Sequence, residues 1–206
     1  MSAEPTVYIV DDDAAMRRSV AFLADSVGWR VQTFDRPEAF LAARPQPPGC
    51  AVLDVRMPSM SGLELQAAMR ARGIALPVIF ITGHADVSLA VQAMKQGAAE
   101  FLEKPFRDQA LLDAIGQAVR RSTQDCAQRE QHAEVRARFA QLTPREREVA
   151  LRVARGESNR VIGEALGISA KTVQVHRQHV LEKIGAHSAA GLAAAILPLQ
   201  STGRGG

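Results

Sequence analysis

Residues 6–122 alternate five short, β-rich apolar runs with five longer stretches of helical periodicity. This alternation constrains the fold more than any other feature, because strand–helix repeats favour a parallel sheet with helices on both faces. The expected strands are Val7–Val10, Arg30–Phe34, Cys50–Asp54, Val78–Thr82 and Glu100–Leu102. The expected helices are about Ala14–Ser26, Pro37–Ala43, Ser61–Arg72, Val87–Gln96 and Arg107–Arg121. We therefore expect an α/β domain with a five-stranded, doubly wound parallel sheet.

Polar side chains stand at the ends of four of these strands: Asp11 and Asp12 after the first, Asp54 on the third, Thr82 on the fourth and Lys104 after the fifth. The carboxyl ends of parallel strands meet at one edge of a sheet, where open α/β sheets bind their ligands. Taken singly, each group could be a helix cap or an ordinary loop residue. Their coincidence at one edge favours a common site.

Three carboxylates, a hydroxyl and an ammonium are the groups needed to hold a divalent metal and a phosphoryl group. Mg²⁺, or another hard cation such as Mn²⁺, prefers oxygen ligands. A carboxylate can also act as a nucleophile toward phosphorus and form an acyl phosphate. We expect Asp54 to be that nucleophile, with Lys104 and Thr82 binding the phosphoryl oxygens.

Length, charge and cysteine content narrow the class of protein. The 206 residues suffice for one large or two small domains. No apolar run approaches the roughly 20 residues of a membrane span, and residues 1–5 lack the layout of a signal peptide, so we expect a cytoplasmic protein with no membrane partner. Cys50 and Cys126 lack the spacing of a disulfide or zinc site. Residues 139–200 carry eight basic against five acidic side chains, which favours a polyanionic partner for this part.

The second part of the chain has helical patterns only. Residues 123–141 contain no Pro or Gly and predict a helical linker. Residues 142–198, divided by Gly156, Gly167 and Gly185, predict a small all-α domain of four short helices. Residues 199–206 are Gly-rich and predict a disordered tail.

Two of these helices have the pattern of a helix-turn-helix. Ser158 can cap the helix 159–166, and Gly167-Ile168-Ser169 forms a tight turn into the helix 170–184. Helical periodicity turns five side chains of the second helix outward: Lys171, Gln174, Val175, Gln178 and Glu182. Glutamines can read adenine edges and a valine can contact a thymine methyl, although a solvated helix face would look similar.

Motifs in both parts resemble one known family. The first part resembles the receiver domain of bacterial two-component response regulators over about residues 5–122, in Asp11-Asp12, Asp54-Val-Arg-Met-Pro, Thr82-Gly83-His84, Phe101 and Lys104-Pro105-Phe106. The second part resembles the LuxR-type DNA-binding domain, in Leu142-Thr-Pro-Arg-Glu-Arg-Glu-Val, Gly156-Glu-Ser-Asn-Arg and Ile168-Ser-Ala-Lys-Thr-Val-Gln-Val-His. The whole chain resembles the NarL/FixJ family of response regulators and is most similar to its FixJ-like branch.

The receiver resemblance implies a flavodoxin-like fold in which Asp54 accepts phosphate from a sensor histidine kinase. It implies metal binding by Asp12, Asp54 and the Arg56 carbonyl, with Asp11 helping through water. It also implies that Thr82 and Phe101 form a switch, and that Lys104-Pro105 is a cis peptide.

The LuxR-type resemblance implies binding to double-stranded promoter DNA. It assigns base contacts to Gln174, Val175 and Gln178. It assigns contacts to the DNA backbone to Ser158, Asn159, Lys171, Thr172 and Arg177. We expect a transcription regulator, most simply an activator that works with RNA polymerase, and not an enzyme. The sequence leaves open whether its target promoters are activated or repressed.

Two activation mechanisms remain open from the sequence. Phosphorylation could create a homodimer contact in which Val91 and Lys95 take part, or it could release a recognition helix that the receiver covers. Two other functions are alternatives. A phosphohydrolase with an aspartyl nucleophile would need a second acid two residues after Asp54, where this chain has Arg56. A receiver whose output half binds only protein would show no salt-dependent DNA affinity.

Overall fold

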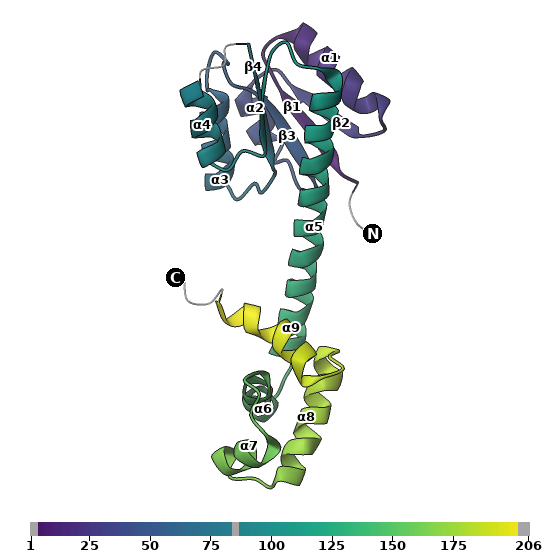
Figure 1. Ribbon diagram of the computed structural model, residues 1–206, viewed down its shortest axis with the longest axis vertical. Helices are drawn as coiled ribbons and strands as arrows, with labels where there is room; N and C mark the ends of the chain where they lie inside the picture. The colour runs from purple at the N-terminus through teal and green to yellow at the C-terminus, as the bar shows by residue number, and fades with distance from the viewer. Residues whose placement is uncertain (1–3, 84–86, 202–206) are drawn as a thin grey trace. The chain divides into compact units, whose positions relative to one another are not determined.

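The computed structural model describes residues 4–83 and 87–201. The chain forms two compact units, Met1–Ala127 and Gln128–Gly206. His84, which belongs to one of the motifs above, lies outside the described residues. Figure 1 shows a sheet with flanking helices in the first unit and a group of helices in the second.

The first unit is built on a five-stranded parallel sheet with the strand order β2-β1-β3-β4-β5. The strands are β1 (Thr6–Val10), β2 (Arg30–Phe34), β3 (Gly49–Asp54), β4 (Val78–Thr82) and β5 (Glu100–Glu103). The helices between them are α1 (Ala14–Ser26), α2 (Pro37–Ala42), α3 (Gly62–Ala71) and α4 (Val87–Lys95), and α5 (Asp108–Ala140) follows β5. The expected fold class is therefore confirmed.

Two layers of side chains bury the sheet. Helices α2, α3 and α4 cover one face, whose core includes Phe40, Leu53 and Phe80. Helices α1 and α5 cover the other face, whose core includes Ile79 and Ile115. All six residues of β3 are buried because this central strand is covered on both faces.

The helix starts follow from their capping residues. Asp13 accepts hydrogen bonds from the backbone N–H groups of Ala15 and Met16 at the start of α1. Ser61 and Glu64 form a reciprocal capping box at the start of α3, as this spacing predicts. Both caps lie in loops that follow strands, so they fix where the chain turns back from the edge at which Asp54 lies.

Helix α5 runs without a break through most of the residues that the sequence predicts as linker. Its first part packs in the first unit, where the Ser122 hydroxyl accepts a hydrogen bond from the N–H of Gly49 at 3.1 Å. Its side chains Val135 and Phe139 pack against the core of the second unit. The linker is thus helical, and its last turns are part of the second unit.

The second unit contains α6 (Pro144–Ala154), α7 (Asn159–Leu166), α8 (Ala170–Ile184) and α9 (Ala189–Ser201). Gly167, which is left-handed at φ 66°, ends α7 and begins the turn into α8. At Gly163, a Cβ would lie 2.6 Å from the Ile168 carbonyl oxygen, so only glycine permits this tight turn to fold back on α7. The helix-turn-helix predicted from the sequence is present as α7 and α8.

The C-terminal boundary differs from the expectation. Residues 199–201, which were expected to belong to a disordered tail, continue helix α9. Pro198 lies inside this helix. A proline removes the hydrogen bond of its own N–H but leaves the N–H groups of the following residues able to bond, so the helix does not have to end there.

Within the described part of the chain, no single helix is long and apolar enough to cross a membrane. Two neighbouring helices, Ala170–Ile184 and Ala189–Leu199, meet the length and composition test only as a pair, and that pair is bent by 64°.

Gly62 marks a close approach between α3 and the end of β3. A Cβ at this position would lie 2.4 Å from the Asp54 carbonyl oxygen and 3.0 Å from the Phe80 ring. We expect Gly62→Ala to destabilise the first unit by about 1–3 kcal/mol, because backbone and ring atoms must move. Urea unfolding followed by the fluorescence of Trp29, the only tryptophan in the sequence, measures this.

Gly83→Ala is the matched control, because a Cβ there meets no atom of the described residues within 4 Å. Equal stabilities of the two variants would contradict the close approach at Gly62.

Glu146 links two helices of the second unit. It completes the capping box of α6 with Thr143, and both of its carboxylate oxygens lie 2.7 Å from the Lys183 ammonium on α8. The hydrogen bond from Lys183, helped by the Thr143 N–H, lowers the pKa of Glu146 to about 2. The ionised form therefore stabilises the folded state above the ordinary pKa of 4.5, and this contribution disappears as the pH falls toward 2.

We expect Glu146→Gln to destabilise the second unit at neutral pH, and the difference from wild type to shrink between about pH 4.5 and pH 2. Thermal unfolding of the full chain, followed by far-ultraviolet circular dichroism over this range, tests the expectation. Glu148→Gln is the control, since Glu148 pairs with Arg145 on the surface. A difference that stays constant with pH would refute the role of the Glu146 charge.

Candidate functional site

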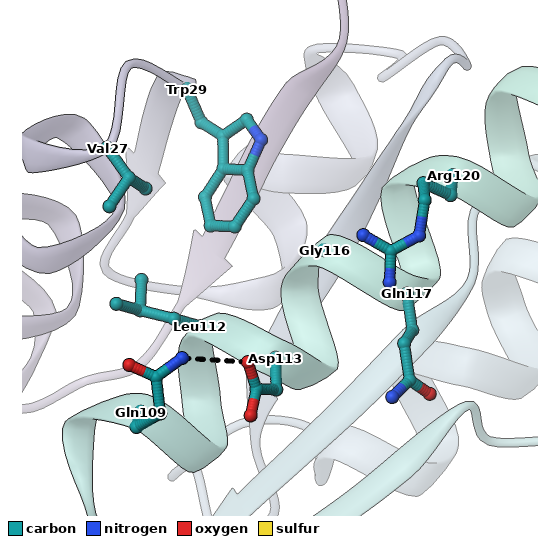
Figure 2. Close-up of a pocket in the computed structure, with 8 residues that line it drawn as sticks. All are labelled: Val27, Trp29, Gln109, Leu112, Asp113, Gly116, Gln117 and Arg120. Carbon is teal, nitrogen blue, oxygen red and sulfur yellow. Dashed lines mark hydrogen bonds between the residues drawn. The ribbon is translucent and has the colours of Figure 1, made fainter.

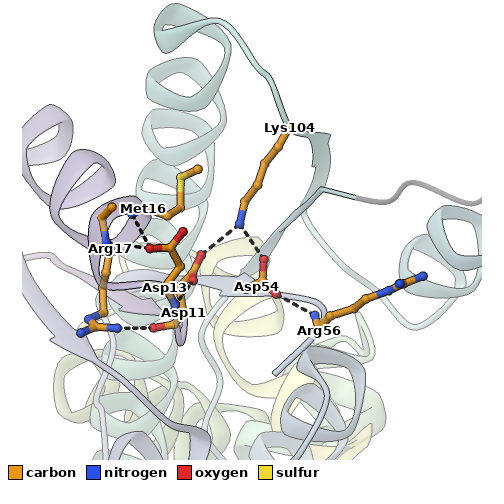
Figure 3. Close-up of polar contacts among 8 residues, drawn as sticks. Asp11, Asp13, Met16, Arg17, Asp54, Arg56 and Lys104 are labelled. Carbon is orange, nitrogen blue, oxygen red and sulfur yellow. Dashed lines mark hydrogen bonds and ion pairs between the residues drawn. The ribbon is translucent and has the colours of Figure 1, made fainter. Parts of the chain in front are cut away.

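Lys104 joins two carboxylates at the carboxyl edge of the sheet. Its ammonium lies 2.7 Å from Asp54 Oδ1 and 3.1 Å from Asp11 Oδ2. Figure 3 shows the lysine side chain reaching from beyond β5 to the ends of β1 and β3. These side chains are up to 93 positions apart in the sequence. They meet because parallel strands end at the same edge of the sheet.

The carboxylate of Asp54 has a donor on each oxygen. Lys104 binds Oδ1, and the backbone N–H of Arg56 donates to Oδ2 at 2.7 Å. The Arg56 side chain is exposed and points away from the site (Figure 3). Asp54 itself is only 6% exposed, so its orientation is set by these two contacts and by the close packing of Gly62 behind its backbone.

Asp11 is the more deeply buried carboxylate. Its Oδ1 accepts a hydrogen bond from the Asp13 N–H at 2.8 Å, and Arg17 donates to its carbonyl oxygen at 2.6 Å. Burial raises the pKa of Asp11 above its ordinary value, although the Asp13 N–H and Lys104 act in the opposite direction. A further cation beside Asp11 would offset this cost of burying its charge.

The protonated form of Lys104 is favoured. Partial burial alone lowers its pKa, but hydrogen bonds to Asp54 and Asp11 outweigh the burial and raise the pKa above its ordinary value. The lysine backbone is fixed as well, because its N–H donates to the Thr82 carbonyl oxygen at 2.7 Å. The Lys104–Pro105 peptide is cis, as the resemblance implies. Lys104 is therefore a fixed positive charge next to the end of β4, where Thr82 is buried.

The side chains around Asp54 are of the kind that binds a divalent metal. Asp11 and Asp54 are buried carboxylates that share a single ammonium, and the exposed Asp12 follows directly. Among the described residues, no three His, Cys, Asp or Glu side chains are grouped closely enough to enclose a metal by themselves. A site with few protein ligands agrees with the preference of Mg²⁺ for keeping several waters.

The expected switch and dimer residues lie on β4, β5 and α4 of the first unit. Phe101 on β5 is half-buried, and its ring centroid lies 6.4 Å from that of Phe80. Val91 and Lys95 are exposed on α4. Met94, which the sequence did not single out, is 47% exposed and lies on the same helix face because it is three residues from Val91.

On α8, the structure separates an outward face from the core. Val173, Val180 and Ile184 are buried. The side chains expected to read bases, Gln174, Val175 and Gln178, are exposed, as are Lys171 and Thr172. The outward face thus carries the polar and apolar groups that could enter a DNA groove.

Several of the expected DNA-backbone contacts already have partners within the unit. Arg177 donates to Asn159 Oδ1 at 3.1 Å and so connects α8 with α7. The Ser158 hydroxyl caps α7, and Thr172 is hydrogen-bonded to Ser169 at the start of α8. Gln178, which is expected to read bases, also has a partner and donates to Glu182 at 3.1 Å. These contacts fix the direction in which the side chains leave their helices.

A separate pocket of about 360 Å³ lies between the turn that precedes β2 and helix α5. Figure 2 shows Trp29 facing Gly116 and Leu112 of α5, beside a hydrogen bond from Gln109 to Asp113. Its lining includes none of the residues around Asp54. The pocket therefore gives Trp29 a partly buried environment in the first unit and is separate from the site around Asp54.

Sequence reasoning missed two residues that shape the site. Arg17 holds the Asp11 backbone, and its position four residues after the cap Asp13 could have suggested that it turns back toward the strand end. Gly62 follows the cap Ser61, but its contact with Asp54 depends on tertiary packing that no local pattern signals.

Comparison with known proteins agrees with both halves of this description. The family described as "Response regulator receiver domain" matches residues 7–116, and the family described as "Bacterial regulatory proteins, luxR family" matches residues 140–196. The transcriptional regulatory protein FixJ of Azorhizobium caulinodans is 47% identical over 183 residues, which are 88% of this chain and 87% of that protein. FixJ of Bradyrhizobium diazoefficiens is 44% identical over 189 residues, or 91% of this chain and 92% of that protein.

A solved structure of the response regulator StyR is similar over nearly the whole length. It matches with a TM-score of 0.82 and 43% identity, and the match covers 94% of this chain and 98% of StyR. With a receiver domain followed by a LuxR-type domain, and with FixJ proteins this similar across both, the chain belongs to the FixJ-like family of DNA-binding two-component response regulators.

Proposed function

We propose that Asp54 accepts a phosphoryl group from a sensor histidine kinase and that this modification controls binding to promoter DNA. The observation that carries the proposal is the Lys104 ammonium 2.7 Å from Asp54 Oδ1, with Asp11 as its second partner. A structural ion pair would need only one carboxylate. Two carboxylates that share one lysine leave negative charge for a second cation to neutralise.

The chain's own residues can carry out the transfer. An Asp54 oxygen attacks the phosphorus, an O–P bond forms, and the P–N bond to the kinase histidine breaks. Lys104 and Thr82 would hold the oxygens of the transferred group, on which charge spreads during the reaction. The shared ammonium is already in place, so it needs little reorganisation.

We propose Mg²⁺, or a similar cation such as Mn²⁺, as the cofactor. Asp11, Asp12 and Asp54, with the Arg56 carbonyl, would hold it. When bound, it would neutralise charge on the phosphoryl oxygens. The buried Asp11 carboxylate, whose pKa is raised by burial, supports the need for a cation at this place.

The output would act through DNA. Gln174, Val175 and Gln178 would contact bases, because they form the exposed face of α8. Contacts to the DNA backbone would come from the start of α7 and from α8, through Ser158, Asn159, Lys171, Thr172 and Arg177. We expect the protein to activate transcription with RNA polymerase and, since its partners are a kinase and chromosomal DNA, to act in the cytoplasm.

Phosphorylation would favour a homodimer through α4. Movement of Thr82 toward the phosphoryl group would let Phe101 turn inward, and the exposed Val91 and Lys95 would join the contact. Two recognition helices would then reach half-sites about 34 Å apart. Turnover of a separate substrate is not expected, because Arg56 stands where an aspartyl phosphohydrolase has its second acid.

A phosphoryl mimic should double the molar mass. We expect light scattering of the full chain with Mg²⁺ to give 22.2 kDa before beryllofluoride is added and twice that mass afterwards. Asp54→Asn should remain monomeric, since the mimic binds the Asp54 carboxylate. Wild-type protein that binds the mimic but stays monomeric would refute control by dimerisation and favour release of a covered recognition helix.

Base and backbone contacts should differ in their dependence on sequence and salt. We expect Gln174→Ala to lose about 1–3 kcal/mol of affinity for a duplex that the wild type selects from random DNA, with little effect on other duplexes. Lys171→Ala should weaken binding to all duplexes and reduce the slope of log K against log salt by about 1. Fluorescence anisotropy over a range of salt concentrations measures both.

Glu103→Gln, a change of charge on the exposed end of β5, provides the control for a general charge effect. If Gln174→Ala weakened all duplexes equally, the outward face of α8 would not be reading bases.

A further inference from the structure

The end of helix α5 is bound to the end of the recognition helix α8. Arg138 Nη1 donates to the carbonyl oxygen of Ile184, the last residue of α8, at 3.0 Å. Its Nη2 pairs with Glu134, one turn earlier on α5, at 2.5 Å. The guanidinium is therefore oriented by its own helix while it holds the neighbouring one.

The end of α8 is shaped to receive this guanidinium. Gly185 is left-handed, at φ 78°, and its N–H bonds back to the carbonyls of Leu181 and Glu182. A Cβ on Gly185 would lie 2.5 Å from Arg138 Nη1, so the absence of a side chain provides the space. A cation at a helix C-terminus also interacts favourably with the helix dipole. Arg138 and Gly185 thus fit each other both sterically and electrostatically.

The same turn of α5 is packed into the second unit. Val135 and Phe139, on either side of Arg138, contact its core. The Arg147 guanidinium of α6 lies 5.4 Å from the centre of the Phe139 ring. The last turn of α5 is consequently a fixed support against which α8 is held.

For base contacts, the position of α8 matters most near its N-terminal end, where Gln174 lies. Gln174 lies ten residues before Ile184, or about 15 Å along the helix axis. A tilt of about 10° at the Ile184 end would move Gln174 by roughly 3 Å. Such a shift exceeds the range of distances that a hydrogen bond to a base tolerates.

We infer that Arg138 is a positioning residue for DNA recognition: it fixes the recognition helix to α5 and does not itself contact DNA. The inference rests on the DNA-binding function and adds a residue outside the helix-turn-helix to it. Helix α5, which begins in the receiver, would then help to position α8 for DNA recognition.

The test compares binding to specific and random DNA. Wild-type full-length chain, with Mg²⁺ and beryllofluoride, first selects short duplexes from a random library. Affinities of wild type, Arg138→Ala, Arg138→Lys and Arg129→Ala for a selected and a random duplex are then measured at several salt concentrations. Arg129 is exposed on the same helix, so its loss controls for the change in net charge.

We expect Arg138→Ala to lose about tenfold in affinity for the selected duplex and less than about twofold for the random one, with an unchanged salt slope. Arg138→Lys should recover part of the loss, because an ammonium can still donate to the Ile184 carbonyl. Arg129→Ala should keep the ratio of the two affinities. If Arg138→Ala unfolds the second unit, as judged by circular dichroism, Glu134→Gln replaces it, and a loss of about threefold confined to the selected duplex is expected.

Three results would overturn the inference: wild-type affinity of the folded Arg138→Ala variant, an equal loss on both duplexes, or a salt slope reduced by about 1, which indicates a direct phosphate contact. If the wild type itself selected no sequence, the proposed DNA recognition would fail together with this inference. The first three outcomes would leave that function intact.

Discussion

The rest of the first unit depends on one constraint: two buried carboxylates share one ammonium. Asp11 and Asp54 both pair with Lys104 at the edge of the sheet, so the cluster has an excess of negative charge in a place from which water is largely excluded. An unbalanced charge of this kind costs free energy unless a cation or hydrogen bonds offset it. The backbone donors of Asp13 and Arg56 supply part of that compensation. The charge that remains is the reason for proposing a cation at this edge.

Such a cluster needs a rigid support, and the packing provides it. Strand β3 is buried along its whole length, and α3 approaches it so closely at Gly62 that no larger residue fits without displacement. The second unit has a similar close approach at a glycine: Gly163 lets the turn before α8 lie against α7. In both units, close contact of the backbone at a glycine fixes an element that carries proposed functional residues: the end of β3 in the first unit and the start of α8 in the second. The orientation of these elements therefore depends on how closely the buried backbone packs and less on the exposed residues.

Much of this arrangement could be predicted from the sequence, for identifiable reasons. The sequence allowed Asp54, Thr82 and Lys104 to be predicted as neighbours, because parallel strands end at a common edge of the sheet. Helix starts were visible because caps such as Ser61 and Thr143 act within three residues. The unequal burial of Asp11 and Asp12 was hidden, since it depends on how the loop after β1 turns. The contact of Arg138 with Ile184 was hidden too, because its partners lie 46 residues apart and neither belongs to a motif.

The shared ammonium gives a reason to expect that the proposed phosphoryl group on Asp54 would change the site. It would replace one negative charge by roughly two and put oxygens where the carboxylate now meets Lys104. One ammonium cannot remain equally close to Asp11 and to the new group, and its bond to Asp11 is already the longer, at 3.1 Å against 2.7 Å. The Lys104 N–H is bonded to the Thr82 carbonyl oxygen, so under the proposed switch a shift of the Lys104 side chain would act next to the end of β4. Phe101 stands on the neighbouring strand β5, against Phe80, and would be the next residue to repack. The proposed switch would then involve only two adjacent strands and would need no change in the sheet itself.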